Sequence, residues 1–179
     1  REAGEPHVKS IGADNINSSS TYEMEVNAFA SSIPMYLDYI IMDCCLMGGV
    51  EVAYELKGVC GKLVFSQTEV LADGLCNYTN VIGRLLNSSE PDLKGLCEDA
   101  YTHYDSQSGS YRSLTISMID CAKLGPLAEA CAKLFSDYRG KMALVNPSSV
   151  QHYFRYNKHW FYDLEDILVQ SGASDEDLK

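Results

Sequence analysis

The chain has 179 residues, of which 46% are hydrophobic, and a formal net charge of -11. This length and composition are enough to bury a core, and one domain is the usual outcome at this size. The acidic balance argues against a nucleic-acid partner, because binding to phosphates needs clustered Lys and Arg side chains. No apolar run is long enough to predict a membrane span. A basic ligand suits the charge, although such a charge can also serve only to keep a protein soluble.

The first part of the chain predicts a loop followed by a strand–helix–strand unit. Residues 1–20 are polar and show no apolar period, which predicts an exposed loop. Apolar residues at helical spacing predict a short helix over 22–32, which a proline ends. The apolar run 36–42 predicts a strand that is covered on both faces. Helical spacing over 46–56 and a second strand-like run over 62–66 complete the unit, which implies a parallel sheet.

The second part of the chain is expected to be mainly helical. Apolar periodicity predicts helices over 78–86, 93–104 and 124–138, with one more strand over 114–119. From Asn146 onward, a turn is expected to lead into a last helical region that contains the aromatic cluster HYFRYNKHWFYDLEDIL.

Seven cysteines are an odd number, so at least one thiol must stay unpaired within the chain. The chain has no paired CxxC or HxxxH motifs of the kind that bind structural zinc, so no metal site is expected. Four cysteines have apolar neighbours and are expected to pack as small hydrophobic residues. They are Cys60, Cys97, Cys121 and Cys131.

The most informative stretch is DCCLMGG, which follows the first predicted strand. Ligand chemistry in α/β sheets gathers at the carboxyl ends of strands. Strand alternation places Asp43 and Cys45 on one side and Cys44 on the other. The glycines are expected to open a helix whose N-terminus activates a thiol and supplies donors to an oxyanion. Cys45 is therefore a candidate nucleophile, and a buried thiol at a tight turn is the alternative.

The stretch DYIIMDCCLMGGVEVAYEL, with KLVFSQTEVLADG after it and HWFYDLEDIL far downstream, resembles the clostripain family of cysteine peptidases. The resemblance covers most of the chain. It implies a caspase-like α/β/α sandwich with a parallel-rich central sheet and a C-terminal helical addition. In these terms residues 1–20 are a loop generated by processing, residues 21–90 form the peptidase core with the nucleophile, and residues 91–179 hold the remaining strand and the helical addition.

The resemblance also implies roles for three residues. Cys45 would be the nucleophile that forms an acyl-enzyme. Asp43 and Asp73 would line a pocket that selects Arg or Lys on the acyl side of the cut bond, because carboxylates pair with cationic side chains. The alternative for Asp73 is a turn residue before Gly74. Cys44 replaces a smaller residue of the family pattern and is expected to be a packing substitution. No cofactor is expected; clostripain is calcium-assisted, but no EF-hand spacing occurs here.

The family pattern includes a catalytic histidine that is followed by glycine and lies before the SIGADN region. None of the four histidines fits, because each is followed by Val, Tyr or Trp. They are His7, His103, His152 and His159. The resemblance therefore implies that the histidine lies on an upstream light chain cut from the same precursor, in a secreted or surface-exposed bacterial enzyme. The alternatives are a fragment or inactive relative, a caspase-like module that binds basic peptides without cutting them, and a thiol hydrolase or transferase on another α/β fold.

Overall fold

The computed structural model describes residues 10–17, 20–76, 78–155 and 158–179. The chain divides into two compact units, Arg1–Ala122 and Lys123–Lys179, which are described separately here. The helix that follows residue 91 packs into the same core as the strands of the first unit.

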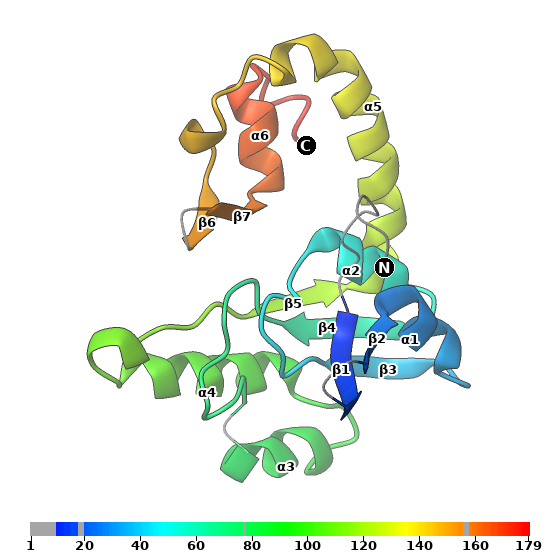
Figure 1. The fold of residues 1–179 in the computed structure, drawn as a ribbon, viewed down its shortest axis with the longest axis vertical. Coiled ribbons are helices and arrows are strands. Elements are labelled where there is room, and N and C mark those ends of the chain that lie inside the picture. Colours follow the sequence, from blue (N-terminus) through cyan, green and yellow to red (C-terminus); the bar gives the residue numbers. More distant parts are fainter. Residues whose placement is uncertain (1–9, 18–19, 77, 156–157) are drawn as a thin grey trace. The chain divides into compact units, whose positions relative to one another are not determined.

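The first unit is built on a mixed three-stranded sheet (Figure 1). Strand β3 (Leu37–Ile41) pairs in parallel with β4 (Cys60–Phe65), and helix α2 (Val50–Leu56) connects them. Strand β5 (Ser117–Asp120) pairs with the other edge of β4 in the antiparallel direction. The predicted strand–helix–strand unit is confirmed. Cover on both faces was predicted for the strand over 36–42, but β3 is half-buried with Asp38 exposed, and it is β4 that is covered on both faces.

Helices cover the sheet on both faces, so the unit is an α/β/α sandwich (Figure 1). Helix α2, with α1 (Val26–Ser32) beside it, lies on one face, and α4 (Leu93–Asp105), with α3 (Tyr78–Leu86) beyond it, lies on the other. Consecutive residues of β4 are completely buried because they point alternately into the two layers. On the α4 side, one cluster of buried residues contains Val64, Leu75, Cys76, Leu93 and Leu96.

The N-terminal loop prediction is wrong for the part of it that the structure describes. Strand β1 (Ser10–Asn17) pairs with β2 (Ser20–Glu25) in an antiparallel hairpin, and α1 begins only at Val26. A hairpin is held by backbone hydrogen bonds, so a polar sequence can form one without an apolar period. Residues 1–9 of the predicted loop lie outside the described residues.

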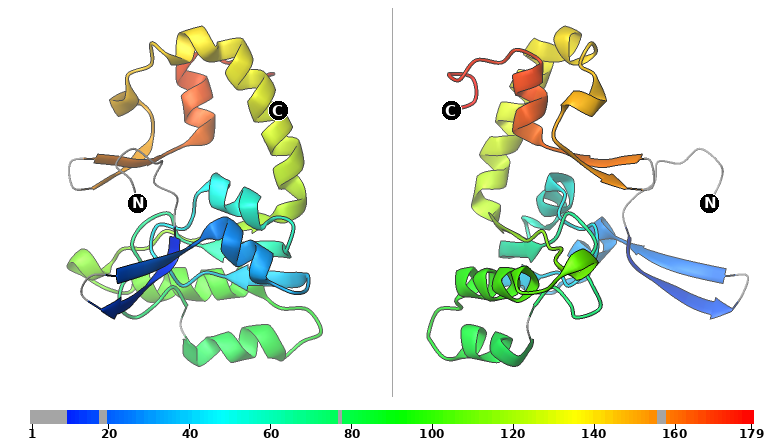
Figure 2. Two further views of the ribbon diagram at one scale, coloured as in Figure 1. Left: turned by 45° about the vertical axis from the view of Figure 1, so that its right-hand side comes forward. Right: turned by 90° about the vertical axis from the view of Figure 1, so that its left-hand side faces the viewer.

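The second unit contains α5 (Leu124–Met142), a hairpin of β6 (His152–Arg155) and β7 (Lys158–Tyr162), and α6 (Leu164–Gln170). Figure 2 shows the hairpin leading directly into α6. The predicted turn and the helix at the end of the aromatic cluster are found, but the first part of the cluster forms the hairpin instead of helix. Exposed and half-buried residues alternate along β7, which is the period of a strand rather than of a helix.

Short 3-10 turns complete the fold. They lie at Gly109–Tyr111, Cys121–Lys123 and Pro147–Ser149. Among the described residues, no helix combines the length and apolarity that crossing a lipid bilayer requires.

Candidate active site

The candidate nucleophile lies in a loop that joins β3 to α2. This loop, residues 42–49, runs beside the segment that leaves β4. The Leu46 N–H donates to the Thr68 carbonyl oxygen at 3.0 Å, and the Gly48 N–H donates to the Ser66 carbonyl oxygen at 2.7 Å. These backbone bonds fix the loop at the carboxyl ends of two parallel strands, as the sequence predicts.

Two residues show why this loop has its sequence. A Cβ atom on Gly48 would lie 2.6 Å from the Gln67 nitrogen, so only glycine allows the two backbones to approach this closely. Leu46 has a φ of 61°, in the left-handed region that non-glycine residues rarely adopt. Backbone strain of this kind clusters at functional sites, and here it lies directly after Cys45.

The Cys45 thiol is exposed and has a defined hydrogen-bond donor. The Val70 N–H donates to Cys45 Sγ at 3.2 Å. Exposure contradicts the alternative of a buried thiol at a tight turn. Helix α2 begins only at Val50, and a neighbouring loop supplies the N–H group that bonds this thiol.

The adjacent Cys44 thiol differs from that of Cys45. Cys44 is only half-buried, yet burial raises its pKa, and the nearby charges of Asp43 and Cys45 raise it further. A raised pKa leaves less thiolate, and the thiolate is the reactive form. The expectation that Cys44 is the inert member of the pair is consistent with this environment.

The Asp43 carboxylate is bonded on both oxygens. Oδ1 accepts the Leu75 N–H at 2.6 Å, and Oδ2 accepts the Tyr78 hydroxyl. That hydrogen bond, together with burial and the carboxylate charge, raises the pKa of Tyr78 to about 12. Gly74 lies against both Asp43 Oδ2 and the Tyr78 ring, and its φ of 87° is in the left-handed region. Asp43 therefore holds the turn that brings the chain from β4 into α3.

Asp73 lies in the same turn and is the more exposed carboxylate, at 67% of its side-chain surface. His103 Nε2 lies 3.4 Å from Asp73 Oδ2, and the Tyr104 hydroxyl donates to the Gly74 carbonyl oxygen at 2.6 Å. Burial raises the pKa of Tyr104, and the charges of Asp73 and Asp43 raise it further. Both carboxylates thus act on the same hydroxyl, and the structure brings Asp43 and Asp73 to one turn.

Four residues of this site were not predicted from the sequence. Val70 contributes a backbone N–H, and Tyr78, His103 and Tyr104 contribute side chains from α3 and α4. Tyr78 and Tyr104 were assigned to helices, but helical spacing does not indicate which loop a helix end will contact. No signal in the sequence identifies these residues.

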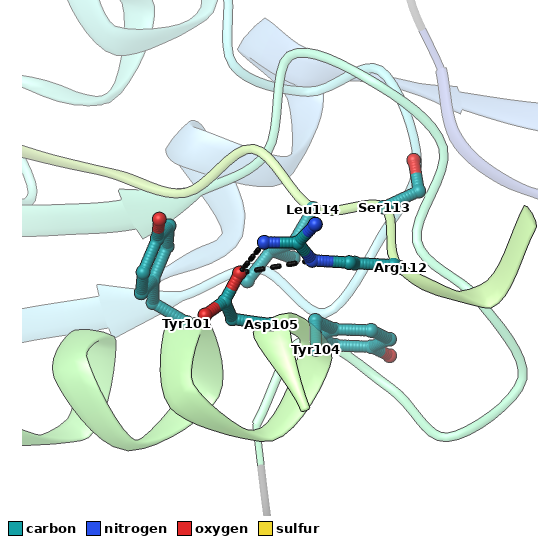
Figure 3. A pocket seen from close by; sticks show the side chains of 6 residues that line it. All are labelled: Tyr101, Tyr104, Asp105, Arg112, Ser113 and Leu114. Atoms are coloured by element: carbon teal, nitrogen blue, oxygen red, sulfur yellow. Dashed lines mark hydrogen bonds and ion pairs between the residues drawn. The ribbon is translucent and has the colours of Figure 1, made fainter. Parts of the chain in front are cut away.

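Two surface hollows lie along α4, and Cys45, Asp43 and Asp73 line neither of them. The first, of about 210 Å³, is shown in Figure 3, where Arg112 reaches across to Asp105. Its lining consists of Tyr101, Tyr104, Asp105, Arg112, Ser113 and Leu114. The second, of about 470 Å³, lies over residues of α4 alone.

The remaining residues with possible catalytic or metal-binding chemistry are the histidines and the other cysteines. His103 is the one histidine of the first unit within the described residues, since His7 lies outside them, and it is paired with Asp73. In the part of the chain that the structure describes, no three His, Cys, Asp or Glu side chains gather in a way that could hold a metal ion. All seven cysteines are free thiols, of which Cys60, Cys76 and Cys121 are buried and Cys97 and Cys131 are half-buried.

A mixed sheet between two helical layers, with an exposed thiol on the loop after a parallel strand and acidic side chains nearby, defines a caspase-like cysteine peptidase fold. The chain belongs to the clostripain family, whose family model matches residues 1–177. A search of curated proteins finds no match.

Solved structures support this assignment. The chain is 30% identical to a clostripain from Bacteroides thetaiotaomicron in complex with the peptide inhibitor BTN-VLTK-AOMK, with a TM-score of 0.73 over 87% of this chain and 67% of that one. It is 33% identical to an inactive zymogen C11 protease from Parabacteroides distasonis, with a TM-score of 0.72 over 86% of this chain and 43% of that one. It is 28% identical to a secreted C11 cysteine protease from Bacteroides thetaiotaomicron, with a TM-score of 0.66 over 83% of this chain and 41% of that one. The chain thus spans less than half the length of the last two.

Proposed function

We propose that the protein is a cysteine endopeptidase that cleaves after Arg or Lys, with Cys45 as the nucleophile of a Cys–His dyad. The observation that carries this proposal is the exposed Cys45 thiol on the loop after β3, with a backbone N–H donor from Val70 at 3.2 Å. Asp43 lies two residues before this thiol, and Asp73 lies three residues after Val70. Membership of the clostripain family supports the same reaction.

The reaction proceeds through an acyl-enzyme. The histidine takes the Cys45 proton, and the thiolate attacks the scissile carbonyl carbon. Collapse of the tetrahedral intermediate breaks the C–N bond, and the histidine returns its proton to the leaving amine. Water then attacks the thioester with the histidine as base, and this releases the new carboxyl group and restores the thiol. These steps need no cofactor; whether calcium assists them is tested by titrating calcium against a chelator.

Asp43 and Asp73 are proposed to receive the basic side chain of the substrate. They border one turn, Asp73 is largely exposed, and carboxylates bind guanidinium and ammonium groups through charge-assisted hydrogen bonds. The peptide part of the inhibitor in the Bacteroides thetaiotaomicron complex, VLTK, ends in lysine, which supports a basic residue at this position.

The dyad histidine is proposed to come from an upstream light chain of the same precursor. Among the described residues β3 pairs only with β4, so a further strand can be added at its other edge. A parallel strand at that edge would end beside the loop that carries Cys45. The zymogen and secreted relatives support activation by processing and a secreted or surface-exposed location.

The test is mass spectrometry of the purified enzyme with its upstream segment, after treatment with peptidyl chloromethyl ketones that end in Arg, Lys or Asp. We expect an adduct on Cys45 from the Arg and Lys probes and none from the Asp probe. The Cys45→Ala variant is the control, because it should take up no probe and cleave no peptide. Equal labelling by all three probes would contradict the basic specificity.

The Asp73→Asn variant, compared with Cys45→Ala, separates the pocket from the nucleophile. Asp73→Asn removes a charge from a largely exposed side chain, so it should weaken the response to basic probes without harming the fold. If the protein takes up no probe but binds Arg or Lys peptides tightly, the chain is instead a non-catalytic module that holds basic peptides.

A further inference from the structure

The two oxygens of the Asp43 carboxylate serve different partners. Oδ1 is turned to the backbone N–H of Leu75, a residue that is completely buried. Oδ2 is turned to the hydroxyl of Tyr78, whose side chain is 61% exposed. The inner oxygen therefore belongs to the fold, and the outer oxygen is the one that a ligand could reach.

Tyr78 covers this outer oxygen closely. A Cβ atom on Gly74 would lie 2.7 Å from Asp43 Oδ2 and 3.1 Å from Tyr78 Cε2, so the glycine leaves room for the ring to lie over the turn. The raised pKa of Tyr78 has the same origin, because the hydroxyl keeps its proton while it donates to the carboxylate.

The Tyr78 side chain is free to leave without disturbing the core. It is the first residue of α3, and α3 packs against the buried cluster through Val81 and Leu85 instead. Rotation of an exposed side chain at a helix terminus breaks one hydrogen bond and exposes little apolar surface. The bond of Asp43 to Leu75 would stay in place and would keep the carboxylate oriented.

We propose that Tyr78 is a displaceable cap on Asp43, and that the group which displaces it is the basic side chain of the substrate. This inference rests on the proposed function, in which Asp43 receives that side chain. The bond from Tyr78 already has an ionised acceptor, but a guanidinium or ammonium group adds a positive charge of its own, so it gains a Coulomb attraction to the carboxylate that a neutral hydroxyl lacks. A cationic side chain can therefore replace the tyrosine hydroxyl.

The cap has a measurable consequence for specificity. A ligand that uses the outer oxygen binds only the uncapped fraction of the enzyme, so its apparent affinity is reduced by that fraction. Removal of the hydroxyl should lower KM for peptides cut after Arg or Lys by about three- to tenfold, the effect expected of one hydrogen bond, and leave kcat unchanged. Peptides cut after norleucine carry no charge to place on Asp43, so their KM should not change.

The experiment measures KM and kcat of Tyr78→Phe and of wild type, each as the whole enzyme with its upstream segment. The substrates are matched peptides that differ only in the residue before the cut bond, which is Arg, Lys or norleucine. Tyr101→Phe is the matched control, because Tyr101 is 60% exposed, lies on α4 and does not bond Asp43. A second variant, Tyr78→Leu, should lower KM in the same way. A fall in KM confined to the basic peptides, in both Tyr78 variants and not in the control, is the expected result.

Two results would overturn the inference, and they can be told apart. If wild type cuts after Arg and Lys but Tyr78→Phe raises KM or leaves it unchanged, Tyr78 positions Asp43 or is irrelevant to it, and only the cap is refuted. If wild type does not cut after Arg or Lys and the Cys45→Ala protein binds no agmatine in calorimetry, the basic pocket itself is absent, and the cap is refuted with it.

Discussion

Gly74 is the residue on which the geometry of the acidic turn depends, and Gly74→Ala is its most direct test. Its φ of 87° costs a residue with a Cβ about 1–2 kcal/mol. The new Cβ would also lie 2.7 Å from Asp43 Oδ2, and crowding in a packed site typically costs about 1–3 kcal/mol. We expect a total loss of about 2–5 kcal/mol, which in a protein of this size lowers the melting temperature by roughly 4–20 °C.

Two other glycines separate these costs. Gly109 has a φ of 60° but nothing within 4 Å of its missing Cβ, so Gly109→Ala carries the backbone cost without the crowding. Gly58 also has open space and is not in the left-handed region, so Gly58→Ala should be neutral or stabilising by a few tenths of a kcal/mol, roughly the gain from a stiffer unfolded chain.

The assay is thermal unfolding of the three variants, followed by the rate of Cys45 labelling with the Arg probe. We expect the melting temperatures to fall in the order Gly58→Ala, Gly109→Ala, Gly74→Ala, and we expect only Gly74→Ala to slow the labelling. If Gly74→Ala were no less stable than Gly109→Ala and were labelled at the wild-type rate, the close contact of the turn with Asp43 would be wrong.

Three further predictions concern thiols and charge. In peptide cleavage assays, Cys44→Ala should keep peptidase activity and Cys45→Ala should lose it. The reverse result would show that Cys44 is the nucleophile and that the assignment to Cys45 is wrong. Burial raises the pKa of Cys60 to about 12 and that of Cys76 to about 11, so both should resist iodoacetamide near neutral pH in the folded protein, with peptide mapping as the readout. The Gly95 N–H and Arg84 lower the pKa of Asp92, and Arg84 lowers the pKa of Asp99, so the stability that Arg84 contributes is present above the usual carboxyl range and is lost as pH falls through the lowered values. Arg84→Met should therefore lower the melting temperature at neutral pH and have little effect near pH 2, and an equal loss at both would contradict the ion pairs.

Long apolar patterns explain what the sequence predicted correctly. The helix over 78–86 has the predicted bounds, and the strands predicted over 36–42 and 62–66 are β3 and β4 within two residues at each end. β4 buries its apolar side chains, and α3 packs Val81 and Leu85 against the buried cluster, so tertiary packing and local pattern agree there. The position of Cys45 followed from the same reasoning, because the end of a buried parallel strand is a defined place in the fold.

The hairpins were missed because their stabilisation comes from backbone pairing rather than from a buried stripe. β1 is polar, and it pairs with β2 across a two-residue connection. β7 carries apolar residues on both of its sides, so its sequence pattern is compatible with an amphipathic helix as well as with a strand. In both hairpins the structure depends on pairing with the partner strand. The apolar pattern of a single segment carries no information about which segment that partner is.

The acidic turn shows the same limit at the level of single side chains. Asp43 was found because it follows a predicted strand, and the resemblance to the clostripain family implied a binding role alone. In the structure its inner oxygen holds the backbone of Leu75, and its outer oxygen meets a tyrosine from the next helix. One carboxylate therefore both builds the turn and faces the proposed substrate. The same side chain lies against the left-handed Gly74, where an added Cβ would come within 2.7 Å of Asp43 Oδ2. Under the proposed function, a basic side chain would therefore bind to the carboxylate that also holds the turn leading into α3.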